Sequence, residues 1–436
     1  MHGPDTHLWH SFAKMGTVRS DEFVITRGDD VWIWDDGGSK YLDAAAVHVS
    51  CNVGHGRTEI NDAIADQLAK LSNHTSFGRF AHEPGLRLAE RLSALAPFDD
   101  ARVLLGSGGS DAVDTSAKLA RRYWYSLGEP DRVHLISRVG SYHGVHGFGT
   151  SISGIPANRE GMGPLIPDVS TVEWDSLSDL ADTVDRVGPG SVAAVYIEPV
   201  MGASGFRSPP EGYFEGVAEI CRDSGALLIV DEVLCGFGRL GKWFGHERWP
   251  GVNPDLITFA KGVSSGYLPL GGVLVSPRVA EPFWSSQDAP SFNHGMSFGG
   301  HATACAAALA NIETMEREGL FDHVLTLEGE IPAIFSSVAE HPLVSQIWAG
   351  VGFLAGIEID PRAISECPSV VQEIATAALD QHVMFRPQAT FLPVSPPLTA
   401  TLEHFELAAD AALHGLNAVA DSHRWDLVAG EAAAGA

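Results

Sequence analysis

Five apolar residues, Ala226-Leu227-Leu228-Ile229-Val230, run directly into an aspartate, Asp231. A second run of the same kind, Leu256-Ile257-Thr258-Phe259-Ala260, runs into a lysine, Lys261. Continuous apolar runs of this length are typical of strands that are buried on both faces of a parallel sheet. Because such sheets bind ligands beyond the carboxyl ends of their strands, Asp231 and Lys261 are candidate site residues.

Four further apolar segments predict strands of the same sheet, at 102–105, 133–136, 192–197 and 272–275. The segment 110–127 predicts a helix, with Ser110 as its N-cap and Asp111 in its first turn. Buried strands that alternate with helices indicate an α/β fold with a mostly parallel central sheet.

The two ends of the chain have a different pattern. Residues 22–25 and 31–34 predict half-exposed strands around a turn at 27–30, and a strand-like stretch lies near 351–357. We therefore expect a large domain over residues 61–315 and a smaller one built from residues 1–60 and 316–436.

Composition excludes several classes of partner. The 436 residues include 28 Lys plus Arg and 55 Asp plus Glu, a net charge of −27, which disfavours nucleic acids and anionic membrane surfaces. No apolar run is long enough for a membrane span, and no secretory signal is recognisable. The 5 cysteines form no CxxC pair, so we expect a cytoplasmic protein without a metal site.

Each candidate residue also has a simpler structural explanation. Asp231 alone could cap a helix or form a local salt bridge, and Lys261 alone could extend its amine to solvent. A lysine at the end of a buried strand is, however, desolvated, and its lowered pKa suits Schiff-base chemistry with a carbonyl.

Two more segments add to this pair. Gly106-Ser107-Gly108-Gly109-Ser110 joins a strand to a helix, where free N–H groups can bind a phosphate. Tyr142-His143-Gly144 follows another strand, and its tyrosine could stack on a flat ring. An amine, a carboxylate, a phosphate site and a stacking ring are together what pyridoxal phosphate requires of a protein.

The chain resembles the class III aminotransferases, which are fold-type I pyridoxal-phosphate enzymes, from about residue 8 to 415. The resemblance rests on Leu228-Ile229-Val230-Asp231-Glu232-Val233, Cys235-Gly236-Phe237-Gly238-Arg239, Pro254-Asp255 and Ala260-Lys261-Gly262, in the family's order. It implies a large domain that binds the cofactor and a smaller α+β domain formed by both termini.

The resemblance also implies roles for individual residues. Lys261 is expected to bind the cofactor as a Schiff base and to move the substrate proton, and Asp231 to pair with the pyridinium nitrogen. The other cofactor-binding residues that it implies are Gly109, Ser110, Tyr142, His143, Val233 and Ser297. Ser297 is expected to reach the phosphate of a second subunit, so that the active sites are shared across a homodimer.

Within the family, the segments around residues 141–155 and 260–271 are similar to ω-amino acid and amine:pyruvate transaminases. There, Arg386, in Val383-Met384-Phe385-Arg386-Pro387, is expected to bind a substrate carboxylate; alone, it could form a surface salt bridge. Glu198 is expected to pair with a switching arginine or to shape the substrate pocket. Val49 stands where these enzymes often have a tryptophan in the pocket.

We therefore expect a ping-pong transaminase that moves an amino group from an ω-amino acid, a primary amine or an amino-bearing intermediate to a keto acid, with pyruvate as the first candidate. A racemase, an aminomutase or a decarboxylase of the same fold is the alternative within the fold. The alternative of another class is a non-catalytic α/β binding protein.

Overall fold

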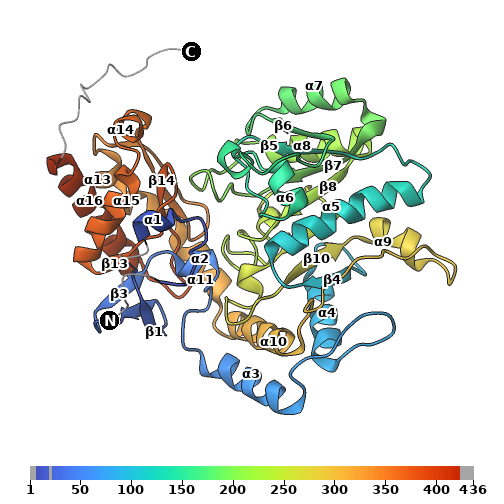
Figure 1. Ribbon diagram of the computed structural model, residues 1–436, viewed down its shortest axis with the longest axis horizontal. Helices are drawn as coiled ribbons and strands as arrows, with labels where there is room; N and C mark the ends of the chain where they lie inside the picture. Colours follow the sequence, from blue (N-terminus) through green and yellow to red (C-terminus); the bar gives the residue numbers. More distant parts are fainter. Residues whose placement is uncertain (1–5, 19–21, 423–436) are drawn as a thin grey trace.

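The computed structural model describes residues 6–18 and 22–422, and its largest sheet has seven strands and lies in the right-hand part of Figure 1. The strand order is β4-β10-β9-β8-β7-β5-β6, with β10 antiparallel to both of its neighbours and the other pairs parallel. The strands are β4 (Arg102–Gly106), β5 (His134–Arg138), β6 (Val169–Val172), β7 (Val192–Ile197), β8 (Leu227–Asp231), β9 (Leu256–Phe259) and β10 (Gly271–Val275). The predicted α/β class with a mostly parallel sheet is confirmed.

Helices cover both faces of this sheet, which explains why its inner strands are apolar throughout. In β8, Leu227 and Ile229 pack with residues of α5 (Gly109–Ser126), whereas Leu228 and Val230 pack with residues of α8 (Tyr213–Ser224). Successive side chains of a strand point to opposite faces, so a strand buried on both sides needs apolar residues at every position.

Two smaller sheets lie beside the large one (Figure 1). One has the order β1-β2-β3-β13 and joins both ends of the chain, since β3 pairs in parallel with β13. The other has the order β11-β12-β14 and is antiparallel. The strands are β1 (Ile25–Asp29), β2 (Trp32–Asp35), β3 (Lys40–Asp43), β11 (Val344–Ala349), β12 (Ala355–Ile359), β13 (Val383–Met384) and β14 (Phe391–Val394).

The remaining helices surround these sheets. They are α1 (Met15–Val18), α2 (Ala46–Val49), α3 (Thr58–Lys70), α4 (Glu83–Leu95), α6 (Gly147–Ile152), α7 (Leu177–Val187), α9 (Pro277–Trp284), α10 (Ala302–Arg317), α11 (Leu320–Leu327), α12 (Ile331–Ile334), α13 (Ser336–Ala339), α14 (Pro361–Glu366), α15 (Val370–Ala378) and α16 (Leu402–Ser422). Short 3₁₀ turns connect several of them. Over residues 6–18 and 22–422, no helix has both the length and the apolar character to cross a membrane.

The terminal strands differ from their predicted positions. The first strand, expected at 22–25, is β1 (Ile25–Asp29), so most of the predicted turn at 27–30 belongs to a strand. The stretch expected near 351–357 is β12 (Ala355–Ile359). The strand β1 is mostly exposed, so no apolar run marks its ends as in the large sheet. The domain limits at residues 60 and 315 stay predictions.

Candidate active site

Six strands of the large sheet run parallel, and their carboxyl ends lie at the same edge. Asp231 is the last residue of β8, and the segments after β4, β5, β7 and β9 carry the glycine-rich turn, the Tyr142-His143-Gly144 turn, Glu198 and Lys261, respectively. Side chains from segments far apart in the sequence therefore meet at one place, as expected for an open α/β sheet.

Asp231 is a buried carboxylate, 5% exposed, that has no arginine or lysine partner among the described residues. One oxygen, Oδ2, accepts a hydrogen bond from Nδ1 of His143 at 2.8 Å, and the other, Oδ1, accepts one from the backbone N–H of Val233 at 3.1 Å. A buried anion with only hydrogen-bond donors around it is suited to a ligand that brings a positive charge.

His143 is fixed by this contact, because an ionised carboxylate can only accept a hydrogen bond. Its side chain is 0% exposed, and its other nitrogen, Nε2, is buried without a hydrogen-bond partner in the described part of the chain. The imidazole is therefore held by Asp231 and orients that carboxylate in turn.

Lys261 lies at the end of β9 with an amine that makes no hydrogen bond to any described residue. Desolvation lowers its pKa to about 8, against the opposing effect of the negative charges of Asp231 and Glu198. Its backbone has φ 42°, in the left-handed region, which is costly for a residue with a side chain. A strained, half-buried lysine with a lowered pKa is suited to act as a nucleophile or a base.

The turn after β4 offers an anion site at the N-terminus of α5, a helix of 18 residues. The helix begins at Gly109 with Gly108 as N-cap, so the prediction that Ser110 is the N-cap is wrong by two positions. The first bond of the helix runs from the N–H of Ala112 to the oxygen of Gly108, and the preceding N–H groups of Gly109 and Ser110 are free to bind a ligand.

Two close approaches fix the parts of this site against one another. A Cβ atom on Gly109 would lie 2.8 Å from Cγ1 of Val233, so only glycine lets the helix start this close to the strand β8 loop. Gly144 has φ +86°, and a Cβ atom there would lie 2.6 Å from Oγ of Ser110. The N–H of Val145 donates to that Oγ at 3.1 Å, which leaves the Ser110 hydroxyl hydrogen available.

Tyr142 is half-buried in the same turn, and burial raises the pKa of its hydroxyl. Its backbone N–H donates to Oε1 of Glu198 at 3.4 Å. Glu198 is 5% exposed and also accepts from the N–H of Gly202 at 3.0 Å, and burial raises its pKa. Glu198 thus orders the loops around Tyr142.

Glu198 and Arg386 form no ion pair within the described residues. Nη1 of Arg386 instead donates to Nδ1 of His48 at 2.7 Å. Arg386 follows β13 and His48 follows β3, and these strands pair in parallel with Met384 opposite Asp43. The parallel register brings both side chains to the same edge of the small sheet, near Lys261. The positive charge of Arg386 helps to lower the pKa of Lys261, and the positive charge of Lys261 helps to lower the pKa of His48.

Two predicted residues are not brought into this group. Val49 is 7% exposed and packs in an apolar cluster with residues that include Val200, Cys235 and Leu354. Ser297 is exposed, and no contact within the described residues joins it to Gly109 or Ser110. His48, in contrast, lies in the group but was missed, because nothing in its neighbouring sequence indicates a partner 338 positions away.

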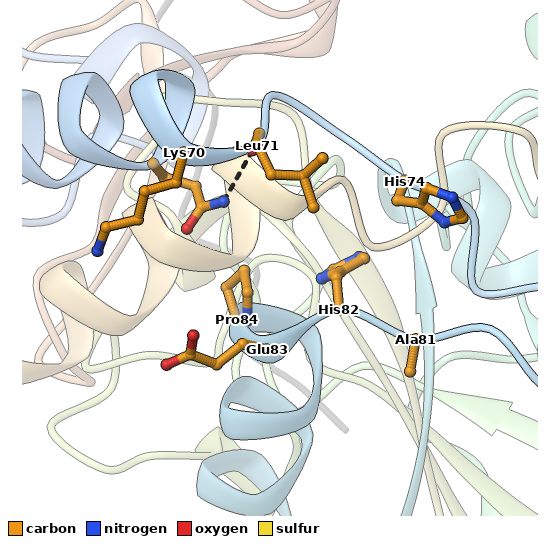
Figure 2. A pocket seen from close by; sticks show the side chains of 8 residues that line it. Lys70, Leu71, His74, Ala81, His82, Glu83 and Pro84 are labelled. Carbon is orange, nitrogen blue, oxygen red and sulfur yellow. Dashed lines mark hydrogen bonds between the residues drawn. The ribbon is translucent and has the colours of Figure 1, made fainter.

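These residues fit pyridoxal phosphate. The carboxylate without a cation suits a pyridinium nitrogen, the amine without a partner suits an aldehyde, and the free N–H groups of α5 suit a phosphate. A pocket of about 280 Å³ lies elsewhere, between α3 and α4 (Figure 2). Its walls contain none of the candidate residues.

The chain is similar to several known proteins. The model of the aminotransferase class-III family matches residues 15–415. A probable aminotransferase of Mycobacterium tuberculosis is 39% identical, over 81% of this chain and 78% of that protein. A β-alanine–pyruvate aminotransferase of Pseudomonas aeruginosa is 32% identical, over 94% of this chain and 96% of that protein. The crystal structure of an amine transaminase from an uncultivated Pseudomonas species, with PLP bound, has a TM-score of 0.89 and 32% identity, covering 95% of this chain and 99% of that one.

Proposed function

Because this chain belongs to the class III aminotransferases, which are pyridoxal-phosphate-dependent transaminases, we propose that its amino donor is an ω-amino acid or a primary amine and that its acceptor is a keto acid, first of all pyruvate. The observation that carries this proposal is an arginine, Arg386, that stands near Lys261 without a carboxylate partner among the described residues. A guanidinium in that position can bind the carboxylate of a donor or an acceptor with two hydrogen bonds.

When bound, pyridoxal phosphate supplies an aldehyde that captures amines and a protonated ring that draws electrons from the substrate carbon. In the proposed site the Lys261 amine would hold the cofactor through its aldehyde. Once a substrate amine is bound, Nζ of Lys261 would take a proton from the substrate carbon and return it, as general base and general acid. Its lowered pKa, about 8, suits both directions of this transfer near neutral pH.

The remaining residues would hold the ring in place. Asp231 would keep the ring nitrogen protonated, and His143 supports this role by donating to Oδ2 of Asp231. The N–H groups of Gly109 and Ser110, with the Ser110 hydroxyl, would bind the phosphate. Tyr142 and Val233 would contact the two faces of the ring, which stays a prediction from the family's pattern.

The proposed homodimer has its own support on the surface. Phe77, Phe80 and Phe298 are 50%, 55% and 68% exposed, and Phe77 packs against Gly295, two residues from Ser297. Large apolar side chains gathered on one surface mark an interaction site. The cavity in Figure 2 lies next to Phe80, since His74 in its wall contacts the Phe80 ring. A second copy of the chain would cover this surface and bring its own Ser297 towards the phosphate.

The proposal is tested in two half-reactions with the PLP-loaded protein. β-Alanine should bleach the cofactor's long-wavelength absorption, and pyruvate should restore it with formation of alanine. A Lys261→Ala variant is the control and should do neither. A chiral amino acid offered to the same protein tests the alternatives: its conversion to the enantiomer, or its loss of carbon dioxide, without use of any keto acid would contradict the proposal in favour of a racemase or a decarboxylase.

A further inference from the structure

The guanidinium of Arg386 rests on an acceptor that carries no charge. Nη1 donates to Nδ1 of His48 at 2.7 Å, and over residues 6–18 and 22–422 no carboxylate forms an ion pair with Arg386. Arginines that are partly withdrawn from water normally pair with a carboxylate. Arg386 is therefore a cation without an anionic partner among the described residues, and it can bind an anionic group of a substrate.

His48 is suited to remain neutral here. Part of its ring reaches solvent, yet desolvation by the surrounding atoms, followed by the positive charges of Lys261 and Arg386, lowers its pKa to about 3. A neutral imidazole that accepts at Nδ1 carries its proton on Nε2. The contact with Arg386 is then a hydrogen bond between a cation and a neutral acceptor, which is weaker than a bidentate bond between a guanidinium and a carboxylate.

The backbone that presents His48 is strained and firmly held. Ala46, Val47 and Val49 have φ of 43°, 64° and 56°, a conformation that is rare for residues with side chains and rarest for β-branched ones. The buried carboxylate of Asp43 accepts from the N–H of Val47 at 2.9 Å and of Ala45 at 3.2 Å. Strain of this kind persists where the surroundings enforce it, and it concentrates at functional sites.

We propose that His48 is a positioning residue that holds Arg386 in place for an incoming carboxylate and yields it to that carboxylate, so that the enzyme favours carboxylate-bearing donors over simple amines. This inference rests on the proposed function. A substrate carboxylate replaces a single bond to a neutral ring with two charge-assisted bonds, and it breaks no ion pair in doing so. An acidic residue at position 48 would compete with the substrate carboxylate for the Arg386 guanidinium. A residue without a hydrogen-bond acceptor would not hold the Arg386 side chain in position.

The test compares β-alanine with propylamine, which lacks only the carboxylate, in the half-reaction of the PLP-loaded enzyme. His48→Asp should raise the KM for β-alanine by about tenfold or more relative to any change that it causes in the KM for propylamine. His48→Ala should raise the KM for β-alanine several-fold, and it carries the test if His48→Asp does not fold. His48→Asn, whose carbonyl oxygen can accept in place of Nδ1, should stay within about threefold of wild type.

Val47→Ala is the matched control, because the Val47 side chain is 53% exposed on the same segment and touches neither Lys261 nor Arg386 in any contact of the described residues. It should leave both donors unchanged. If His48→Asp and His48→Ala change the KM values for both donors alike, or change neither, the inference about His48 is overturned. The proposed transaminase function is not affected by that result. A wild type that reacts with propylamine alone overturns the carboxylate preference, and one that reacts with neither donor overturns the proposed function itself.

Discussion

The amine of Lys261 should be much more reactive near neutral pH than that of an ordinary lysine. Desolvation, partly offset by the charges of Asp231 and Glu198, lowers its pKa from 10.5 to about 8. A lowered pKa enlarges the neutral fraction at every pH below it: at about pH 7, roughly 9% of Lys261 would be uncharged, against roughly 0.03% of an unperturbed lysine. Since the neutral amine is the nucleophile, Lys261 should capture an aldehyde about 300-fold faster at that pH.

The assay is the rate of absorbance change when cofactor-free protein is mixed with pyridoxal phosphate across the pH range. The rate should rise about tenfold per pH unit below pH 8 and level off above it. Pyridoxal without phosphate is the control, because the phosphate also titrates. Asp231→Asn removes the largest influence that raises the pKa of Lys261, so its midpoint should move below that of wild type. A rate that keeps rising tenfold per unit up to pH 10 would refute the reasoning.

Three other variants test the site and its surroundings. Gly144→Ala adds a Cβ atom 2.6 Å from Oγ of Ser110 at φ +86°. It should raise the Kd for pyridoxal phosphate by about tenfold or more in a fluorescence titration. Gly128→Ala is the control: Gly128 has φ +82° and nothing within 4 Å of its added Cβ atom, so this variant should lose about 1 kcal/mol of stability and keep the wild-type Kd. Asp231→Asn should lower the rate of transamination by more than about 100-fold in steady-state assays, and near-normal turnover would contradict its role. Phe298→Asp places a charge on a side chain that is 68% exposed and should shift the proposed dimer towards monomer in light scattering; an unchanged mass would place the interface elsewhere.

The strands of the large sheet could be predicted because they are buried on both faces. The apolar run before Asp231 and the run at β7 (Val192–Ile197) predict strands from their composition alone. The residues at the ends of these runs could then be placed at the ligand-binding edge of the sheet, because parallel sheets bind ligands beyond the carboxyl ends of their strands. The start of α5 was misplaced, because the serine at position 110 resembles an N-cap, whereas Oγ of Ser110 is used by Val145 instead.

Contacts between distant segments could not be predicted in this way. His48 meets Arg386 only because β3 pairs with β13, and a two-residue strand leaves almost no pattern in the sequence. Val49 has φ 56° and packs in an apolar cluster, while the neighbouring His48 contacts the arginine. The predicted place of Val49 at the substrate pocket stays a prediction. Strained backbone of this kind is fixed by tertiary contacts, here those of Asp43, rather than by local preference.

Borohydride reduction of the PLP-loaded protein, followed by digestion and mass mapping, asks whether Lys261 is the residue that holds the cofactor. Reduction makes the bond between a lysine and the cofactor permanent. The account predicts a pyridoxyl adduct on the peptide that contains Lys261, and no adduct in the Lys261→Ala variant. An adduct on another lysine, such as Lys118 or Lys242, would contradict it.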